Sequence, residues 1–384
     1  MDESPFVMSA EHLLFQEETR RFARKELMPG YLERSFSEEF PAVEARKLAD
    51  AGLTSLLLGE EHSGQGADLV SFGLAAEEVA YADPNCAFLV LNTNILVKLL
   101  SGHPSPALRD RARLLASGEQ LGCLALTEPG VGSDAGALTT QATRCAEGWR
   151  LSGEKTSVSL APHADVALVI ARTRPGPGSS GIAAFLVELG DPSVSRQRFR
   201  DSGVRPLGRG SISMADTFVP DDHVVAEPGT GFPFIMREFD LSRTIIALMA
   251  TGPARRALDS AIDYSRQRRS FGKPLAAHQG VSFDIAEHAT YVEGVRALAF
   301  QTLGLRQARR PHTAQAAMLK WWAPKVAFDA IQACIVLHGH IAWSDEMPLQ
   351  SLLRDVSGYQ IGDGTPQIQK LVIARHLIGR EATS

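Results

Sequence analysis

The stretch ADVALVIART, residues 164–173, decides the fold class because it is a short apolar run set between helical flanks. Its length and its β-branched residues are typical of a strand. WRLSGEK (149–155) and GIAAFLVEL (181–189) have the same character, and the Gly- and Pro-rich segments RPGPGSSG and LGDPS separate such runs. Since Gly and Pro mark turns between strands, the pattern predicts a small antiparallel β domain over residues 121–232.

The chain on either side of this domain has helical periodicity. SAEHLLFQEETRRFARKEL (9–27) begins with a Ser cap and repeats apolar residues at helical spacing. ARRALDSAIDYSRQ (254–267) places Ala, Leu and Ile on one stripe, and two longer amphipathic segments follow, the second expected to bend near Pro324. This order predicts a mainly α protein with a central β domain: an N-terminal helical domain (1–120), the middle β domain (121–232) and a C-terminal four-helix bundle (233–384).

Composition excludes several function classes. A formal net charge of −5 and a pI near 6.1 argue against binding to nucleic acid or to an anionic membrane. The four cysteines lie far apart, with no CxxC pair and no His at zinc spacing, so we expect reduced thiols and no metal site. The N-terminus carries acids where a signal peptide needs basic residues, and the most apolar run is too short to span a bilayer. We therefore expect a cytoplasmic protein.

Three motifs combine reactive residue types with a backbone that a ligand can approach. LALTEPGVGSDAGAL (124–138) is Gly-rich and carries hydroxyls, which suits a flat, acceptor-rich ring or a phosphate, although a tight interdomain loop explains it equally well. Arg268, in YSRQRRSFGKPLAAHQ (264–279), either pairs with a phosphate or is a solvated helix-end cation. Asp363 lies between two glycines in YQIGDGTPQIQ (359–369), where it is either a turn residue or a working carboxylate.

Together, in this order and spacing, these motifs resemble those of the acyl-CoA dehydrogenase family. LTEPGVGSD is similar to the family's TEPxxGSD, YSRQRRSFGKPLAAHQ to its YxxxRxxFGxxxxxxQ, and IGDGTPQIQKLVIAR to its IxEGTxxIQxxxIAR. GEEHSGQGADLVSFGLAAEEVAYAD (59–83) is similar to a helix of the family that contains a Glu-Glu pair. The resemblance covers essentially the whole chain, and it implies the helical, β and helical order that the periodicity predicts independently.

The resemblance implies bound FAD, and the residues that it assigns to this cofactor are Thr127, Ser133, Ser157, Ser159, Arg268, Phe271, Gln279, Gly339, Thr365 and Gln367. Those from the β domain would contact the flavin, with Ser159 near N5 and Ser157 where the family usually has Trp. Those from the C-terminal region would hold the pyrophosphate and adenine side, in this family usually of a neighbouring subunit's FAD. A shared cofactor implies a homo-oligomer, either a dimer or a tetramer.

The reaction that the resemblance implies is α,β-dehydrogenation of an acyl thioester, with electrons passing to an electron-transfer flavoprotein. The family usually has Glu as its base at the position of Asp363, whereas some branches place it at the position of Ser242. Asp363 is therefore the acid expected to remove the α-proton, and Gly364 beside it would let the backbone approach the thioester carbonyl. Asp240 and Arg243 would lie on the substrate side, although a buried ion pair between them explains both residues as well.

Departures from the family pattern at Ser63, Ser157, Leu160, Val336 and His340 indicate a divergent branch, which leaves three alternatives. The first is the same oxidation of an acyl group carried by an acyl-carrier protein. The second is an oxidase of the nitroalkane oxidase type, which uses Asp as its base and O₂ as its acceptor. The third is a weakly catalytic flavin-binding protein like the family's DNA-binding member, and the acidic pI counts against it.

Overall fold

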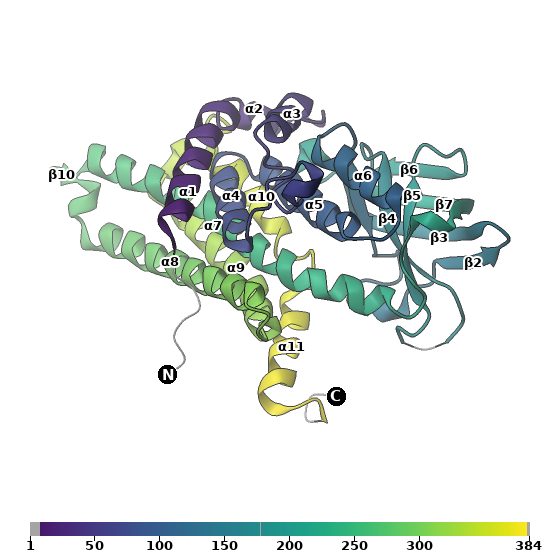
Figure 1. Ribbon diagram of the computed structural model, residues 1–384. Helices are drawn as coiled ribbons and strands as arrows, with labels where there is room; N and C mark the ends of the chain where they lie inside the picture. Colours follow the sequence, from purple (N-terminus) through teal and green to yellow (C-terminus); the bar gives the residue numbers. More distant parts are fainter. Residues whose placement is uncertain (1–7, 177, 382–384) are drawn as a thin grey trace.

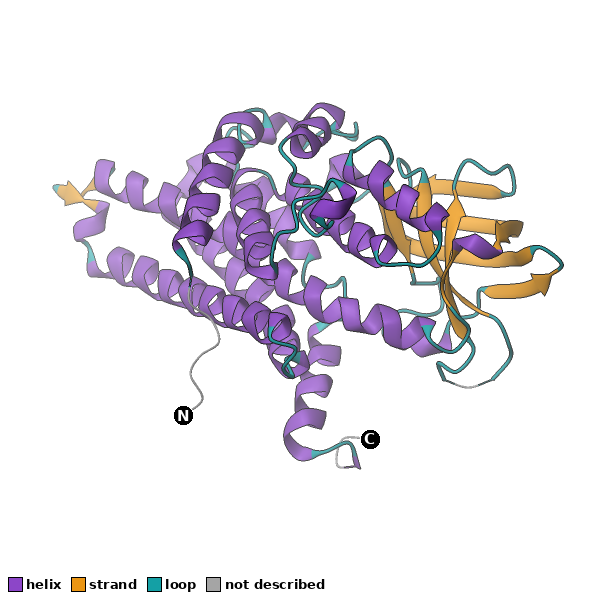
Figure 2. Ribbon diagram, in the orientation of Figure 1, coloured by secondary structure: helices purple, strands orange, loops and turns teal. Residues whose placement is uncertain are grey.

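The structure is a computed structural model that describes residues 8–176 and 178–381. Helical, β and helical regions follow one another along the chain, as the sequence predicts. The sheet lies at one end of the molecule, and the long C-terminal helices extend from it toward the opposite end (Figures 1 and 2).

The N-terminal region is built from helices that surround one buried helix. Its elements are α1 (Ala10–Phe22), η1 (Ala23–Leu27), α2 (Tyr31–Arg34), α3 (Ala42–Asp50), η2 (Glu60–His62), α4 (Leu69–Ala82), α5 (Pro84–Ser101) and α6 (Pro106–Ala116). The predicted cap is confirmed, because the Ser9 hydroxyl accepts a hydrogen bond from the backbone N–H of His12. Almost every residue of α4 is buried, since this helix packs against α1, α5, α7 and α8.

The middle region is a mixed sheet rather than the antiparallel one that the sequence predicts. Its strands are β1 (Gly122–Ala125), β2 (Gln141–Cys145), β3 (Gly148–Ser159), β4 (Val166–Arg172), β5 (Ile182–Glu188), β6 (Val194–Arg198), β7 (Arg209–Pro220) and β8 (Val224–Ala226). Their order is β6-β7-β3-β2-β4-β5-β8, with β1 beside β4. Most pairs are antiparallel, but β4 pairs in parallel with β1, Gly122 lying opposite Val166, and with β2, Gln141 lying opposite Arg172. Parallel strands need a long connection between them. The chain between β1 and β4, which contains the β2–β3 hairpin, is such a connection.

Strand β4 contains the stretch that predicts the β domain, and its residues Val166 to Ala171 are all fully buried. A strand covered on both faces has an unbroken apolar sequence instead of an alternating one. The β4 sequence VALVIA is such a run. This strand therefore lies inside the molecule, with the helical regions against it.

The C-terminal region consists, within the described residues, of three long helices and two shorter ones. Its elements are α7 (Gly231–Gln267), β9 (Arg269–Ser270), β10 (Lys273–Pro274), η6 (Leu275–Ala277), α8 (Gln279–Gln307), α9 (Thr313–His338), η7 (Gly339–Trp343), α10 (Leu349–Gly358) and α11 (Pro366–Ile378). α9 runs through Pro324 without interruption and packs against α7, α8, α10 and α11. By length and composition alone the segment Thr313–Trp343 would suffice to cross a membrane, but here it is a helix of this bundle.

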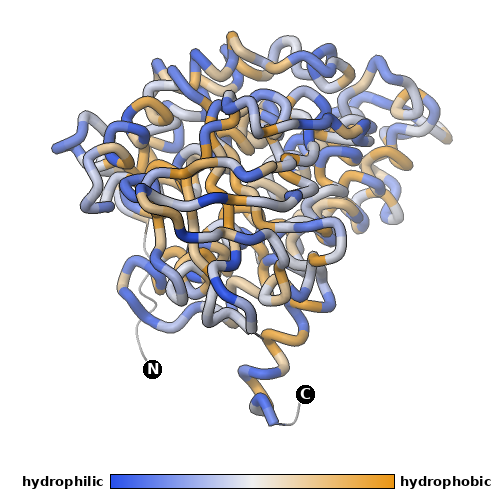
Figure 3. Tube along the Cα trace, turned by 90° about the vertical axis from the view of Figure 1, so that its right-hand side faces the viewer, coloured by the Kyte–Doolittle hydropathy of each residue, from blue (hydrophilic) through white to orange (hydrophobic). Residues whose placement is uncertain are grey.

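One apolar cluster joins the three regions; it contains Phe72 of the N-terminal region, Phe185 of the middle region and Leu248 of the C-terminal region. Hydrophobic segments run through the interior and hydrophilic ones over the outside (Figure 3). Close contact between α4 and α7 depends on Gly252, where an added Cβ would lie 2.6 Å from the backbone N of Tyr81. The site described next therefore rests on helices that are fixed by this common core.

Candidate active site

Asp363 lies in the loop between α10 and α11, in a backbone conformation that few residues adopt. Its φ is +53° and that of Gly364 is +98°. Asp tolerates the left-handed region better than most residues do, and Gly adopts it freely. The side chain of Asp363 is half-buried, so its carboxylate is neither enclosed in the core nor fully in solvent.

Two consecutive residues of α7 hold Asp363. The Ser242 hydroxyl donates a hydrogen bond to Asp363 Oδ2 at 2.5 Å. Arg243 Nε donates to the backbone carbonyl of Asp363 at 3.2 Å. The structure thus brings together the two positions at which the resemblance expects an acid, and the hydroxyl at one of them orients the carboxylate at the other.

Asp240 and Arg243 form the ion pair that the sequence offered as one interpretation. Arg243 Nη1 lies 3.0 Å from Asp240 Oδ1, and both residues are 8% exposed. The second carboxylate oxygen of Asp240 accepts a hydrogen bond from the Thr313 hydroxyl at 2.7 Å. Asp240, two residues before Ser242 on the same helix, therefore fixes Arg243 and the start of α9.

The two glycines beside Asp363 differ in whether the structure has room for a side chain at their position. A Cβ at Gly364 would lie 2.4 Å from Gln369 Nε2, whereas a Cβ at Gly362 would meet open space. Gln369 is fully buried and donates to the carbonyls of Asp363 (3.0 Å) and Gly364 (3.2 Å). The expected glycine requirement thus has a steric reason at Gly364 alone.

The glutamine that contacts the loop is Gln369, whereas the sequence predicts Gln367 as a cofactor contact. Gln367 is exposed on α11, whereas Gln369 points into the loop. The signal was present, because Gln369 and not Gln367 matches the final Gln of the pattern IxEGTxxIQ. Thr365, predicted as a cofactor contact, is the N-cap residue of α11.

The Gly-rich loop of the β domain is fixed by a buried carboxylate. Glu128 accepts hydrogen bonds from the backbone N–H groups of Thr139 (2.6 Å) and Thr140 (2.8 Å) and from Lys155 Nζ (2.7 Å). Burial alone would raise the pKa of Glu128, but the Lys155 ammonium and the threonine donors lower it to about 2. Glu128 therefore stays ionised and anchors the loop, while added Cβ atoms at Gly130 and Gly132 would meet open space.

The hydroxyl residues predicted to face the flavin lie on this loop and on the adjacent strand β3. The backbone N–H of Thr156 donates to the carbonyl of Thr127 at 2.8 Å, which joins the loop to the strand. Ser157 is exposed at a bulge in β3, with φ +56°, and accepts a hydrogen bond from Arg209 at 2.9 Å. Ser133 is exposed and Ser159 half-buried, so the loop and β3 together present hydroxyls to a ligand.

The residues predicted for the pyrophosphate and adenine side lie elsewhere. Arg268, Phe271 and Gln279 surround the β9–β10 hairpin, which Figure 1 shows at the end of the molecule opposite the sheet. Phe271 is 94% exposed. Gly339 follows α9 near the same end, where the rings of Tyr264 and His338 stack with centroids 4.6 Å apart. Within one chain the structure therefore does not bring the two halves of the predicted cofactor site together.

The chemistry of the two groups fits the two parts of FAD. Hydroxyls and exposed backbone N–H groups in the β domain can bond the acceptor-rich flavin ring. An exposed guanidinium at Arg268 can pair with a phosphate. Their separation fits a cofactor that lies between two copies of the chain.

Comparison with known proteins agrees with this assignment. Family models for the acyl-CoA dehydrogenase N-terminal, middle and C-terminal domains match residues 9–119, 123–217 and 229–378. The mitochondrial short-chain specific acyl-CoA dehydrogenase of Bos taurus is 33% identical over 370 residues, which cover 96% of this chain and 90% of that protein.

Solved structures give the same result. Butyryl-CoA dehydrogenase from Megasphaera elsdenii superposes with a TM-score of 0.92 at 30% identity, covering 98% of this chain and 100% of the other. The structure of PigA with FAD and proline superposes with a TM-score of 0.94 at 25% identity, covering 99% and 100%.

The fold, together with the hydroxyls on loop 124–138 and β3, defines a flavoprotein oxidoreductase. The chain belongs to the acyl-CoA dehydrogenase family, whose FAD-dependent members dehydrogenate acyl-CoA. FAD is accordingly its cofactor.

Proposed function

We propose that this enzyme oxidises a short or branched acyl-CoA, with Asp363 as the base that removes the α-proton. The observation that carries the proposal is the half-buried Asp363 carboxylate, held by the Ser242 hydroxyl at 2.5 Å. It is the acid at the family's base position, and Ser242 occupies the alternative position. Bound FAD supplies the acceptor for the hydride that leaves the β-carbon.

Removal of the α-proton requires a base in reach of Cα and donors to the thioester carbonyl. A base must come within hydrogen-bond distance of its proton, and donors to the carbonyl stabilise the charge that develops there. The loop can provide both, since its backbone is exposed beside the carboxylate. Its conformation is fixed by Arg243, Gln369 and Lys320, which donate to its carbonyls.

The size of the acyl group follows from the length of the base. Asp is one methylene shorter than Glu, so its carboxylate reaches about 1.5 Å less far, by ordinary single-bond geometry. A small acyl group, or one branched near Cα, can approach closely enough to compensate. The names of the relatives from Bos taurus and Megasphaera elsdenii, short-chain specific and butyryl-CoA dehydrogenase, support a short chain.

A panel experiment tests the substrate class. Purified enzyme with FAD is mixed anaerobically with acyl-CoAs of increasing length, with branched acyl-CoAs, and with the same acyl groups on an acyl-carrier protein. We expect the flavin absorbance to bleach fastest with a short or branched acyl-CoA, and electrons to pass on to an electron-transfer flavoprotein. Bleaching by the carrier-bound acyl groups alone would contradict the proposal.

An oxidase of the nitroalkane oxidase type is a second candidate, favoured by the single observation that the base is Asp and not Glu. Such an enzyme would bleach with a primary nitroalkane and consume O₂ as it turns over. Nitroalkanes are therefore included in the panel, with oxygen uptake as the readout. Failure of every acyl-CoA, together with oxygen uptake on a nitroalkane, would establish this alternative.

We also propose a homo-oligomer, because the residues that fit the phosphate side of FAD lie at the opposite end of the chain from those that fit the flavin. In a dimer or tetramer, Arg268 and Gln279 of one copy would complete the cofactor site of another. Loss of FAD and dissociation of subunits should then occur together. Sedimentation over a dilution series tests this, and a monomer that keeps its FAD would contradict it.

A further inference from the structure

Lys320 is a buried lysine on α9, beneath the loop that carries Asp363. It is 0% exposed and is among the largest fully buried side chains. Its ammonium donates to the backbone carbonyl of Tyr359 at 2.7 Å and lies 3.4 Å from that of Gly364. These two carbonyls stand at the two ends of the loop 359–364, so one side chain connects both ends.

Packing alone does not explain a buried lysine at position 320. A buried ammonium is costly unless it is paired, and an apolar side chain would fill the same space more cheaply. No carboxylate of the described residues lies within 4 Å of its nitrogen, and its hydrogen bonds go to the loop of the proposed base. The cation is therefore placed where its donors act on that loop.

The charged groups that face Lys320 belong to the same site. Asp363 on the loop and Arg243 on α7 are the two whose charges act on it. Burial lowers the pKa of Lys320 to about 8, against the attraction of the Asp363 carboxylate and with the repulsion of Arg243. Its positive charge is thus present at neutral pH and is lost in mildly alkaline solution.

We propose that Lys320 is a positioning residue for proton abstraction, which joins the two ends of loop 359–364 and thereby keeps the Asp363 carboxylate in place against the substrate. The proposal rests on the proposed function, in which Asp363 is the base. Three side chains from three helices then donate to the backbone carbonyls of the loop: Arg243 from α7, Lys320 from α9 and Gln369 from α11. Of these three, Lys320 is the one that reaches both ends of the loop.

The test uses full-length enzyme loaded with FAD and compares Lys320→Met with wild type. The matched control is Lys325→Met on the same helix, because the Lys325 side chain is 59% exposed and pairs with Asp329 one turn along. The rate constant for anaerobic flavin reduction by the best acyl-CoA is measured from pH 6 to pH 10, together with FAD content and substrate affinity.

We expect Lys320→Met to keep FAD and substrate affinity while flavin reduction slows by on the order of 10²-fold, the effect of displacing a reacting group by about 1 Å. The wild-type rate should fall above about pH 8, where Lys320 loses its charge, and this fall should be absent in the Met variant. Lys325→Met should match wild type in both respects. If Lys320→Met does not fold, Lys320→Gln, which keeps a donor without the charge, is measured in its place.

Two outcomes would overturn the inference. Wild-type rates and a wild-type pH profile in Lys320→Met, or in Lys320→Gln where that variant stands in, would show that the lysine does not act on the base. Loss of substrate affinity with an unchanged reduction rate would show a purely binding or structural function. Asp363→Asn, measured in parallel, separates this result from the proposed function: a slow Asp363 variant beside a normal Lys320 variant overturns the inference alone.

Discussion

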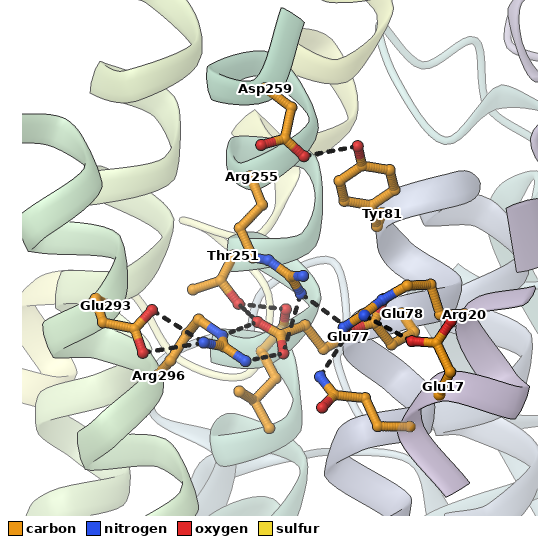
Figure 4. A network of polar contacts seen from close by, with 12 residues as sticks. Glu17, Arg20, Glu77, Glu78, Tyr81, Thr251, Arg255, Asp259, Glu293 and Arg296 are labelled. Atoms are coloured by element: carbon orange, nitrogen blue, oxygen red, sulfur yellow. Dashed lines mark hydrogen bonds and ion pairs between the residues drawn. The ribbon is translucent and has the colours of Figure 1, made fainter. Parts of the chain in front are cut away.

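Two acidic sites contact α7, and their carboxylates have opposite surroundings: the Glu77–Glu78 pair of α4 and Asp363 in the loop before α11. Glu77 and Glu78 of α4 are 0% and 1% exposed, and guanidinium groups of Arg20, Arg255 and Arg296 surround them (Figure 4). Asp363, by contrast, is half-exposed, and the hydrogen bond given to its carboxylate comes from a neutral hydroxyl, that of Ser242.

The first cluster satisfies each carboxylate several times. Glu77 accepts hydrogen bonds from Arg296 Nε at 2.6 Å and from the Thr251 hydroxyl at 2.8 Å, and Glu78 accepts from Gln16 at 2.8 Å. Figure 4 shows these contacts linking α1, α4, α7 and α8. Burial alone would raise the pKa of Glu78, but Arg20 and Arg255 lower it, so this carboxylate stays ionised and fixed in place. The Glu77–Glu78 cluster therefore stabilises the fold, whereas Asp363 keeps one oxygen available for chemistry.

The largest effect is expected from Asp363→Asn, which removes the base and keeps the size of the side chain. Flavin reduction should slow by at least about 10³-fold, as expected for loss of a group that acts only in the transition state. FAD content and melting temperature should stay near wild type. Asp363→Glu should keep part of the activity and prefer a different acyl chain length. Stopped-flow absorbance measures both variants, and a wild-type rate in the Asn variant would identify another base.

Glu77→Gln should act on stability alone. Breaking a buried ion pair leaves its partner arginines without a counter-charge, which typically costs about 3–5 kcal/mol, or on the order of 5 °C in apparent melting temperature for a chain of this size. The reduction rate per bound FAD should not change. Glu293→Gln is the matched control, because Glu293 binds the same Arg296 but its side chain is 69% exposed, so little loss is expected. If Glu77→Gln slowed flavin reduction without lowering the melting temperature, Glu77 would act on the reaction and not on the fold, unlike what its contacts indicate.

Arg268→Ala should weaken FAD retention by roughly 10-fold, the usual effect of losing one charge-assisted hydrogen bond. Arg266→Ala is the control, since Arg266 is a neighbouring arginine on the last turn of α7 with a side chain that is 71% exposed. Dilution or dialysis followed by absorbance of the released flavin measures the difference. Equal retention in both variants would show that Arg268 does not contact the cofactor.

The smallest effect concerns Asp355 of α10, which joins the three regions by accepting hydrogen bonds from Tyr31, Val204 and Asn85. Burial raises the pKa of Asp355 to about 6. Since the folded state then binds this proton more tightly than the unfolded state does, the contribution is stabilising at low pH and is lost as pH rises through 6. Asp355→Asn should therefore lose least stability, relative to wild type, at pH 8 and most at pH 5. Melting curves at both values test this, and a constant difference would contradict it.

Much of this architecture could be predicted from local sequence patterns. The Ser9 cap, the helical periodicity of residues 254–267 and the apolar run of β4 are local features, and each gave the right element. The parallel pairing of β1 with β4 could not be predicted, because register between distant strands depends on the connection and not on either strand's sequence.

The site was predictable to the extent that its residues match a motif. Asp363 stands out by its two glycine neighbours, and the structure adds its contact with Ser242 on a distant helix. Lys320 gave no such signal, because a Lys in an amphipathic helix is ordinarily a surface residue, and Gln369 is marked by its place in the motif alone. What distinguishes them is burial against the loop, which depends on how α9 and α11 pack.

Exchange of the α-proton itself tests most directly whether Asp363 is the base. FAD-loaded enzyme is incubated anaerobically in D₂O with the acyl-CoA that bleaches it, and deuterium at Cα of the recovered acyl-CoA is counted by mass spectrometry. Reversible proton removal by Asp363 predicts deuterium incorporation by the wild-type enzyme and incorporation near background in Asp363→Asn. Incorporation at the wild-type rate in Asp363→Asn would show that Asp363 does not remove the proton.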